Sequence, residues 1–125
     1  MKIINISIEN LSISAELNDT ATAQQILESL PLEGAVNVWG EEIYFEIPLE
    51  IDLEGDARAD VEVGELGYWP SGTAFCIFFG PTPASADEKP RAYSPVNIFG
   101  HILGDATQFK AVSNGSKIRV SHSSD

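Results

Sequence analysis

Aromatic and proline residues gather between residues 67 and 83, and they are the part of the sequence best suited to binding chemistry. Trp69-Pro70 and Phe79-Gly80-Pro81 each end a strand-like run, so we expect both turns to meet at one rim of the fold. Alternation along 75–79 sends some rings inward and others outward. Exposed rings beside a rigid proline turn can form an apolar cleft for a ligand. Core packing is the competing explanation for the same residues.

Two titratable residues could add chemistry to that cleft. Glu46 lies on a strand-like run before Pro48 and would favour a cationic or donor-rich partner, and His101 follows Gly100 in another run. Together they could serve as acid and base in an enzyme, although a surface histidine is the simpler interpretation. The candidate ligand-binding residues are Glu46, Tyr68, Trp69, Phe78, Pro81, Thr82, Pro83 and His101. No residue is assigned a catalytic role.

The acidic loop before residue 61 invites a calcium interpretation, which its spacing does not support. Ala57 stands where an EF-hand loop needs glycine, and Val63 stands where it needs a bidentate acid. The acids that match the first half of the frame are Asp52, Glu54, Asp56 and Asp60. We therefore interpret this segment as a solvated acidic loop.

The remaining motifs point away from metals and cofactors. His101 and His122 are far apart in the sequence, so a zinc site would need acids to complete it. Gly-rich phosphate-binding motifs do not occur. Cys76, the single cysteine, lies in an apolar run and is expected to be a buried, inert thiol. We expect no metal and no cofactor.

Charge and composition exclude several classes of function. The 125 residues carry a net charge of −12, and residues 1–57 hold twelve acids and one base. Such a chain lacks the basic surface that nucleic acids or anionic lipids require. With 43% hydrophobic residues it is not a disordered acidic tail. No signal peptide and no apolar run long enough to span a bilayer is visible, so we expect a cytoplasmic protein with a solvated acidic face.

Hydrophobic periodicity predicts the elements that must position these residues. Alternation over 2–8 and 11–17 predicts a β-hairpin, and apolar residues at helical spacing over 23–30 predict one helix, capped by Asp19 or Thr20 and ended by Pro31. A second hairpin is expected from 35–39 and 43–47 with Gly40 in its turn. Further strands are predicted at 61–63, 66–69, 74–79, 96–103 and 117–120, with a helical turn at 105–112, polar loops at 49–60 and 84–95, and a frayed tail at 121–125.

Short strands at close intervals favour a closed sheet without exposed edges. The sequence thus predicts a mainly β domain over residues 1–125, a closed β-barrel of about eight or nine short strands with one α-helix and a short helical turn.

Three segments resemble the small prokaryotic cyclophilin-like family: Gly67–Gly72, Phe78–Pro83 and Ser94–Gly100, followed by Gly104-Asp105. The resemblance covers nearly the whole chain and implies a cyclophilin-type β-barrel. Cyclophilins are peptidyl-prolyl isomerases whose catalysis rests on an arginine in a Phe-His-Arg strand motif. The matching strand here, Ile43–Pro48, has no arginine; its nearest charged residue is Glu46, and a carboxylate only accepts hydrogen bonds.

Three functions follow from this comparison. The first is a binding module for a peptide or small molecule at the aromatic and proline rim. The alternative is a prolyl isomerase with a non-standard site, in which Arg58 or Arg91 reaches the rim from a loop. The third is an enzyme of another class that uses Glu46 and His101.

Overall fold

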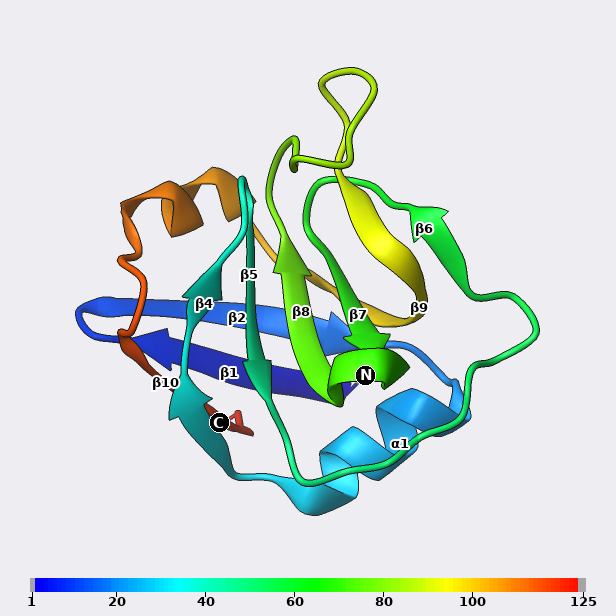
Figure 1. Cartoon of the computed structure of the whole chain (residues 1–125). Coiled ribbons are helices and arrows are strands. Elements are labelled where there is room, and N and C mark those ends of the chain that lie inside the picture. Colours follow the sequence, from blue (N-terminus) through cyan, green and yellow to red (C-terminus); the bar gives the residue numbers. More distant parts are fainter. Residues whose placement is uncertain (1, 124–125) are drawn as a thin grey trace.

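The computed structural model describes residues 2–123 and is mainly β (Figure 1). Within these residues there are ten strands, one α-helix and two 3-10 helices. The strands are β1 (Lys2–Ile8), β2 (Leu11–Leu17), β3 (Leu32–Ala35), β4 (Asn37–Val38), β5 (Glu42–Glu46), β6 (Arg58–Asp60), β7 (Glu65–Trp69), β8 (Ala74–Phe78), β9 (Arg91–Ile102) and β10 (Lys117–His122). The helices are α1 (Ala21–Ser29), η1 (Pro70–Gly72) and η2 (Ala106–Ala111).

The N-terminal hairpin and the helix confirm the sequence prediction. β1 pairs antiparallel with β2, and the alternate residues Ile4, Ile6 and Ile8 are buried. The side chain of Thr20 accepts a hydrogen bond from the backbone N–H of Ala23, which caps α1. Local periodicity was sufficient here because each element buries one face only.

One sheet joins nine strands in the order β3-β10-β1-β2-β9-β7-β8-β5-β4, and β6 pairs with β9 outside this path. The sheet ends at β3 and β4, so the predicted closed barrel is not confirmed. These end strands are consecutive in the chain and are separated by Val36, whose backbone bonds to the turn before β10 instead. The Phe45 ring packs beside β3, where a Cβ at Gly34 would lie 2.8 Å from its Cδ2 atom.

Several boundaries differ from the prediction, and the strand expected at 35–39 is divided into β3, which begins at Leu32, and β4. In place of the strand expected at 61–63, the structure has β6 at Arg58–Asp60. Strand β9 begins at Arg91, inside the segment predicted to be a polar loop. His122 belongs to β10, although it was predicted to lie in a frayed tail. The β6–β9 ladder pairs Arg58 with Val96 and Asp60 with Arg91. Arg58, Asp60 and Arg91 are charged and exposed, so hydrophobic periodicity could not reveal β6 or the start of β9.

Side chains of β8 alternate between two hydrophobic clusters on opposite faces of the sheet. Phe75 and Ile77 join the main core with residues of β1 and β2, which cross behind β5, β8 and β7 in Figure 1. The opposite face carries a smaller outer cluster of Val61, Ala74, Cys76, Phe78, Ala92 and Val96, with Tyr44, Trp69 and Ile98 packed against it. The sheet is thus covered on both faces in this region.

Asn97 ties the acidic loop to the helix and the sheet. Its fully buried side chain accepts from the backbone N–H of Glu54 (2.8 Å) and donates to the carbonyl of Asp52 (2.9 Å) and to Thr22 Oγ1 (3.1 Å). The Glu54 carboxylate in turn accepts from the N–H of Thr22 in the first turn of α1 (3.1 Å). One amide on β9 therefore satisfies polar groups from two other segments, the acidic loop and α1.

No helix among residues 2–123 combines the length and apolar character needed to cross a membrane.

We predict that Asn97→Ala lowers the free energy of unfolding by about 2–3 kcal/mol, because it leaves buried polar groups without hydrogen-bond partners. Urea denaturation followed by circular dichroism would measure the loss. Asn37→Ala is the matched control, since Asn37 is exposed and its side chain makes only one long contact, 3.5 Å to the Tyr44 carbonyl. Equal unfolding midpoints for the two variants would contradict the role given to Asn97.

Candidate functional site

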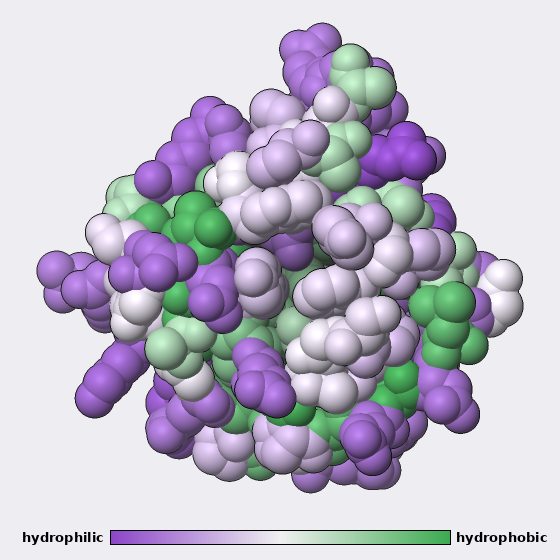
Figure 2. Space-filling view, viewed as in Figure 1, coloured by the Kyte–Doolittle hydropathy of each residue, from purple (hydrophilic) through white to green (hydrophobic). Residues whose placement is uncertain are grey.

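A small pocket on the outer face of β5, β8 and β7 brings aromatic rings around a buried acid. Its volume is about 110 Å³. We call it the aromatic pocket; it is lined by Trp39, Glu42, Tyr44, Trp69, Cys76, Ala92, Tyr93 and Val96. Figure 2 shows side chains of intermediate hydropathy gathered over the middle of this face, with hydrophilic side chains around its margin.

The rings stand edge to face along the pocket wall. Trp39 and Tyr93 have centroids 6.1 Å apart at 67°, and Tyr93 and Trp69 are 5.9 Å apart at 68°. Tyr44 continues the series, 6.4 Å from Trp69 at 80°. The Trp69 ring is held by a hydrogen bond from Nε1 to Ser94 Oγ (2.6 Å). Ring faces and edges thus point in several directions around one small space.

A tight turn between β4 and β5 places Trp39 beside Glu42. The backbone N–H of Trp39 donates to the Glu42 carbonyl (2.9 Å), and the Glu42 N–H donates back (3.2 Å). Gly40 takes a φ of +60° in this turn, as the sequence predicted for its glycine. A Cβ at Gly40 would lie 2.8 Å from Pro83 Cδ, so the turn packs closely against the proline-rich loop.

Glu42 is the unusual group of this pocket. The residue is only 5% exposed, and its Oε1 atom has no hydrogen-bond partner. Burial raises the pKa of Glu42 from 4.5 to about 8, against a smaller lowering by the neighbouring Cys76 thiol. The Glu42 carboxyl group is therefore protonated at neutral pH.

Cys76 lies under the pocket as a buried thiol. Burial raises its pKa well above the usual value, and the nearby Glu42 carboxyl adds to that shift. The Sγ atom lies 3.8 Å from the Ala74 carbonyl. A thiol without a base to deprotonate it is a poor nucleophile, in line with the inert role expected from the sequence.

Of the predicted site residues, Trp69 lines the aromatic pocket, whereas Tyr68 and Phe78 lie in the interior. Tyr68 faces the main core, where its hydroxyl donates to the Leu49 carbonyl (2.6 Å) and accepts from the Ile51 N–H (3.2 Å). Phe78 belongs to the outer cluster. Alternation explains why Tyr68 and Trp69 face opposite sides of the sheet. Phe78 shares the face of Trp69 but is fully buried within the outer cluster.

The predicted proline turn supports the pocket from outside. The Pro81 carbonyl accepts from the Glu41 N–H (2.9 Å), and Thr82 Oγ1 donates to the Arg91 carbonyl (2.5 Å). Pro81 and Pro83 are exposed, while Thr82 is buried. These three residues hold the Gly40 turn and the start of β9 in place, and none of them lines the aromatic pocket.

Glu46 and His101 are not brought together. Glu46 is the last residue of β5 and pairs across the sheet with Ala74, which in turn pairs with Trp69. Thr73 Oγ1 lies 3.5 Å from the Glu46 carboxylate. His101 pairs across the sheet with Glu65 at the opposite end of β7, and its Nε2 lies 3.8 Å from Glu16 Oε1. An acid–base pair of Glu46 and His101 has no geometric support.

Two of the four acids singled out in the acidic loop, Glu54 and Asp60, make internal contacts, and Asp60 lies 3.3 Å from Arg91. Glu54 bonds to Thr22 at the start of α1, as described above. Among the side chains of residues 2–123, no three of the His, Cys, Asp and Glu type gather where they could hold a metal ion.

Comparison with known proteins agrees with this architecture. A model described as cyclophilin-like matches residues 2–121. The chain belongs to the cyclophilin-like family. A hypothetical protein from Archaeoglobus fulgidus, known from a solution structure, is 33% identical with a TM-score of 0.82, over 98% of this chain and 95% of the other. No curated protein matches the chain.

The arginines considered for an isomerase site are engaged elsewhere in this cyclophilin-like chain. Arg58 forms a fork with Glu65 (2.8 and 2.9 Å), and that hydrogen bonding raises the pKa of Arg58. Arg91 lies 3.3 Å from Asp60. No arginine is among the described residues that line the aromatic pocket.

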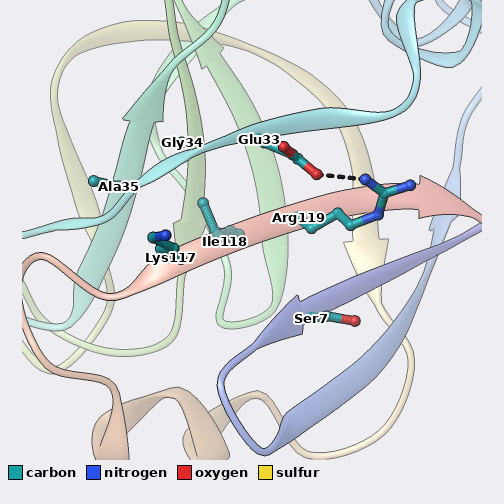
Figure 3. Close-up of a pocket in the computed structure, with 7 residues that line it drawn as sticks. All are labelled: Ser7, Glu33, Gly34, Ala35, Lys117, Ile118 and Arg119. Atoms are coloured by element: carbon teal, nitrogen blue, oxygen red, sulfur yellow. Dashed lines mark hydrogen bonds and ion pairs between the residues drawn. The ribbon is translucent and has the colours of Figure 1, made fainter.

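A second, wider depression of about 580 Å³ lies over β1, β10 and β3 (Figure 3). Arg119 reaches across it to Glu33, and Lys117 and Ser7 border it. Its charged pair is already satisfied, and the rim offers no buried unpaired group. We therefore place the candidate site of this cyclophilin-like protein at the aromatic pocket.

Sequence reasoning did not select Trp39, Glu42, Tyr44 or Tyr93. One signal was available: Trp39 and Glu42 flank the predicted Gly40 turn and must therefore face each other. Glu42, Tyr44 and Glu46 also alternate along one face of β5, and Glu42 is the member that the structure buries. Tyr93 lay in a predicted loop and gave no signal.

We predict that stability falls as the pH rises, because Glu42 keeps its proton in the folded chain and loses it on unfolding. The contribution is fully present below pH 4.5 and is lost as the pH rises through about 8. The free energy of unfolding should fall by about 1.4 kcal/mol per pH unit across this window. Denaturant titrations at several pH values would measure the slope.

Glu42→Gln should remove that slope, since its amide does not titrate. Glu46→Gln is the matched control and should keep it, because Glu46 is exposed on the same strand. Parallel stability curves for wild type and Glu42→Gln over this window would contradict the assignment.

Proposed function

We propose that this protein is a binding module that receives one group of a peptide or small molecule in the aromatic pocket. The observation that carries the proposal is a pocket lined by four aromatic rings and by Glu42, whose buried Oε1 atom has no hydrogen-bond partner. Buried polar atoms in folded proteins are almost always satisfied. An unpaired one that lines a pocket therefore suggests that a ligand completes it.

The size of the pocket limits what enters. Its 110 Å³ is smaller than the ~300–1,000 Å³ typical of sites that enclose a drug-sized ligand. A single terminal group fits, and the rest of the ligand would lie outside. Tyr93, which is 75% exposed, stands at the mouth and offers a further ring surface for that outer part.

Prolyl isomerase activity is the weaker alternative. The family relationship is its support, and the positions of Arg58 and Arg91 are against it, since both pair with acids away from the rings. Glu46 stands on the strand that would carry the arginine. An ionised carboxylate accepts hydrogen bonds, whereas an arginine donates them.

We predict saturable binding of small probes at the two tryptophans. The chain has two tryptophans, and both line the aromatic pocket, so their indole N–H signals in NMR spectra report directly on its occupancy. Choline and 3,3-dimethyl-1-butanol share one branched shape and differ in charge. At least one of them should shift both indole signals; no shift with either would overturn the proposed site.

Trp69→Ala should weaken that binding about tenfold, equivalent to ~1.4 kcal/mol, because it removes one wall. The remaining Trp39 signal would follow the titration. Leu53→Ala is a control that truncates an exposed apolar side chain on the acidic loop and should bind as the wild type does.

We predict no prolyl isomerase activity above the uncatalysed rate in a protease-coupled peptide assay. A measurable rate that Arg58→Ala or Arg91→Ala abolishes would instead establish the alternative.

A further inference from the structure

The ligand's chemical class can be taken one step further, and this step rests on the proposed binding function. We propose that the group received is an alkylated ammonium cation, enclosed by the rings of Trp39, Tyr44, Trp69 and Tyr93, with the Glu42 carboxylate as its counter-ion.

The four aromatic rings favour a cation. Interplanar angles of 67°, 68° and 80° show that successive rings meet edge to face and are not stacked. All four rings line the same pocket. The faces of aromatic rings are electronegative, so a cation held among several of them is attracted from more than one side. Two of the four rings are tryptophans, which bind cations best.

The Glu42 carboxyl group also favours a cation. Glu42 is nine-tenths buried and lines the pocket, and its Oε1 is unpaired. A neutral apolar guest would leave that oxygen unsatisfied, and an anionic guest would be repelled by the ionised form. A cation compensates the charge of the ionised carboxylate even where it has no N–H to donate, and it keeps the ring contacts.

The scarcity of acceptors distinguishes an alkylated ammonium from a primary amine. A primary ammonium carries three N–H donors, each of which needs an acceptor once it is buried. Trp69 Nε1 is a donor and is already bound to Ser94, and the ring faces accept only weakly. A methylated nitrogen has few or no N–H groups and presents methyl groups to the rings. The small volume also suits a compact head group.

Binding should release a proton. The titratable groups around Glu42 are Tyr44 on the same strand, Cys76 on β8 and Tyr93 on β9, and no Lys, Arg or His is among the described lining residues. Glu41, the preceding residue, pairs with Lys110 instead (3.6 Å). Because burial keeps Glu42 protonated up to about pH 8, a cation that binds at pH 6 or 7 must displace that proton. Affinity should therefore rise about tenfold per pH unit up to that point and then level off.

Choline and 3,3-dimethyl-1-butanol test the proposal as a matched pair, because the alcohol replaces the charged nitrogen by carbon. Indole signals and isothermal titration would give both affinities from pH 6 to 9. We expect choline to bind at least about tenfold more tightly at pH 8, and only choline to show the pH dependence. Equal affinity for the two probes would overturn the cationic ligand while leaving the binding module intact; no binding of either would overturn both.

Glu42→Gln should remove the preference for choline and its pH dependence, whereas Glu46→Gln should keep both. Unchanged choline binding by Glu42→Gln would overturn the counter-ion role. Because the comparison of the two probes is made on the wild type, the test does not depend on the variant folding. A short peptide with a central trimethyllysine, compared with its unmodified lysine form and with choline, then tells whether the cation belongs to a peptide or to a small molecule.

Discussion

Burial of β7, β8 and β9 on both faces is the constraint on which the rest of this structure depends. A sheet covered on one side only would leave Glu42, Tyr44 and Cys76 in solvent, and no pocket would exist. The second cover lies close to the strands because Gly67 has no side chain; a Cβ there would lie 2.8 Å from Val96 Cγ2. This close approach lets the start of β9 fold over the outer face and carry Tyr93 to the rings of Trp39 and Trp69.

Polar groups inside this arrangement are handled in two different ways. Asn97 is fully buried and makes three hydrogen bonds to the acidic loop and α1, so it fixes that loop in one place. Glu42 is almost as buried, yet one of its oxygens is unpaired. The first arrangement contributes to the stability of the fold. The second costs stability, and a cost retained at the centre of an aromatic pocket is what a binding function would explain.

Elements with one buried face were predictable from the sequence, and those defined by pairing across the sheet were not. Alternating isoleucines predicted β1, and Thr20 and Pro31 bounded α1 correctly. The charged β6–β9 ladder and the ends of the sheet at β3 and β4 depend on partners far away in the chain. The site follows the same rule. Trp69 could be selected from its aromatic neighbourhood, but Glu42 differs from Glu46 only in what packs over it, and the sequence of β5 does not contain that information.

The protonated state of Glu42 has a consequence for the electrostatics of the whole molecule. The chain has a net charge of −12, and its field attracts every cation in solution, including the proton. A guest cation that takes the place of the Glu42 proton exchanges one positive charge for another, so the charge of the complex equals that of the empty protein. The long-range field of the protein then contributes little to the binding free energy, because it acts equally on the proton released and on the cation bound. Below about pH 8, ionic strength would have little influence on how much ligand is held, even though the protein is strongly acidic.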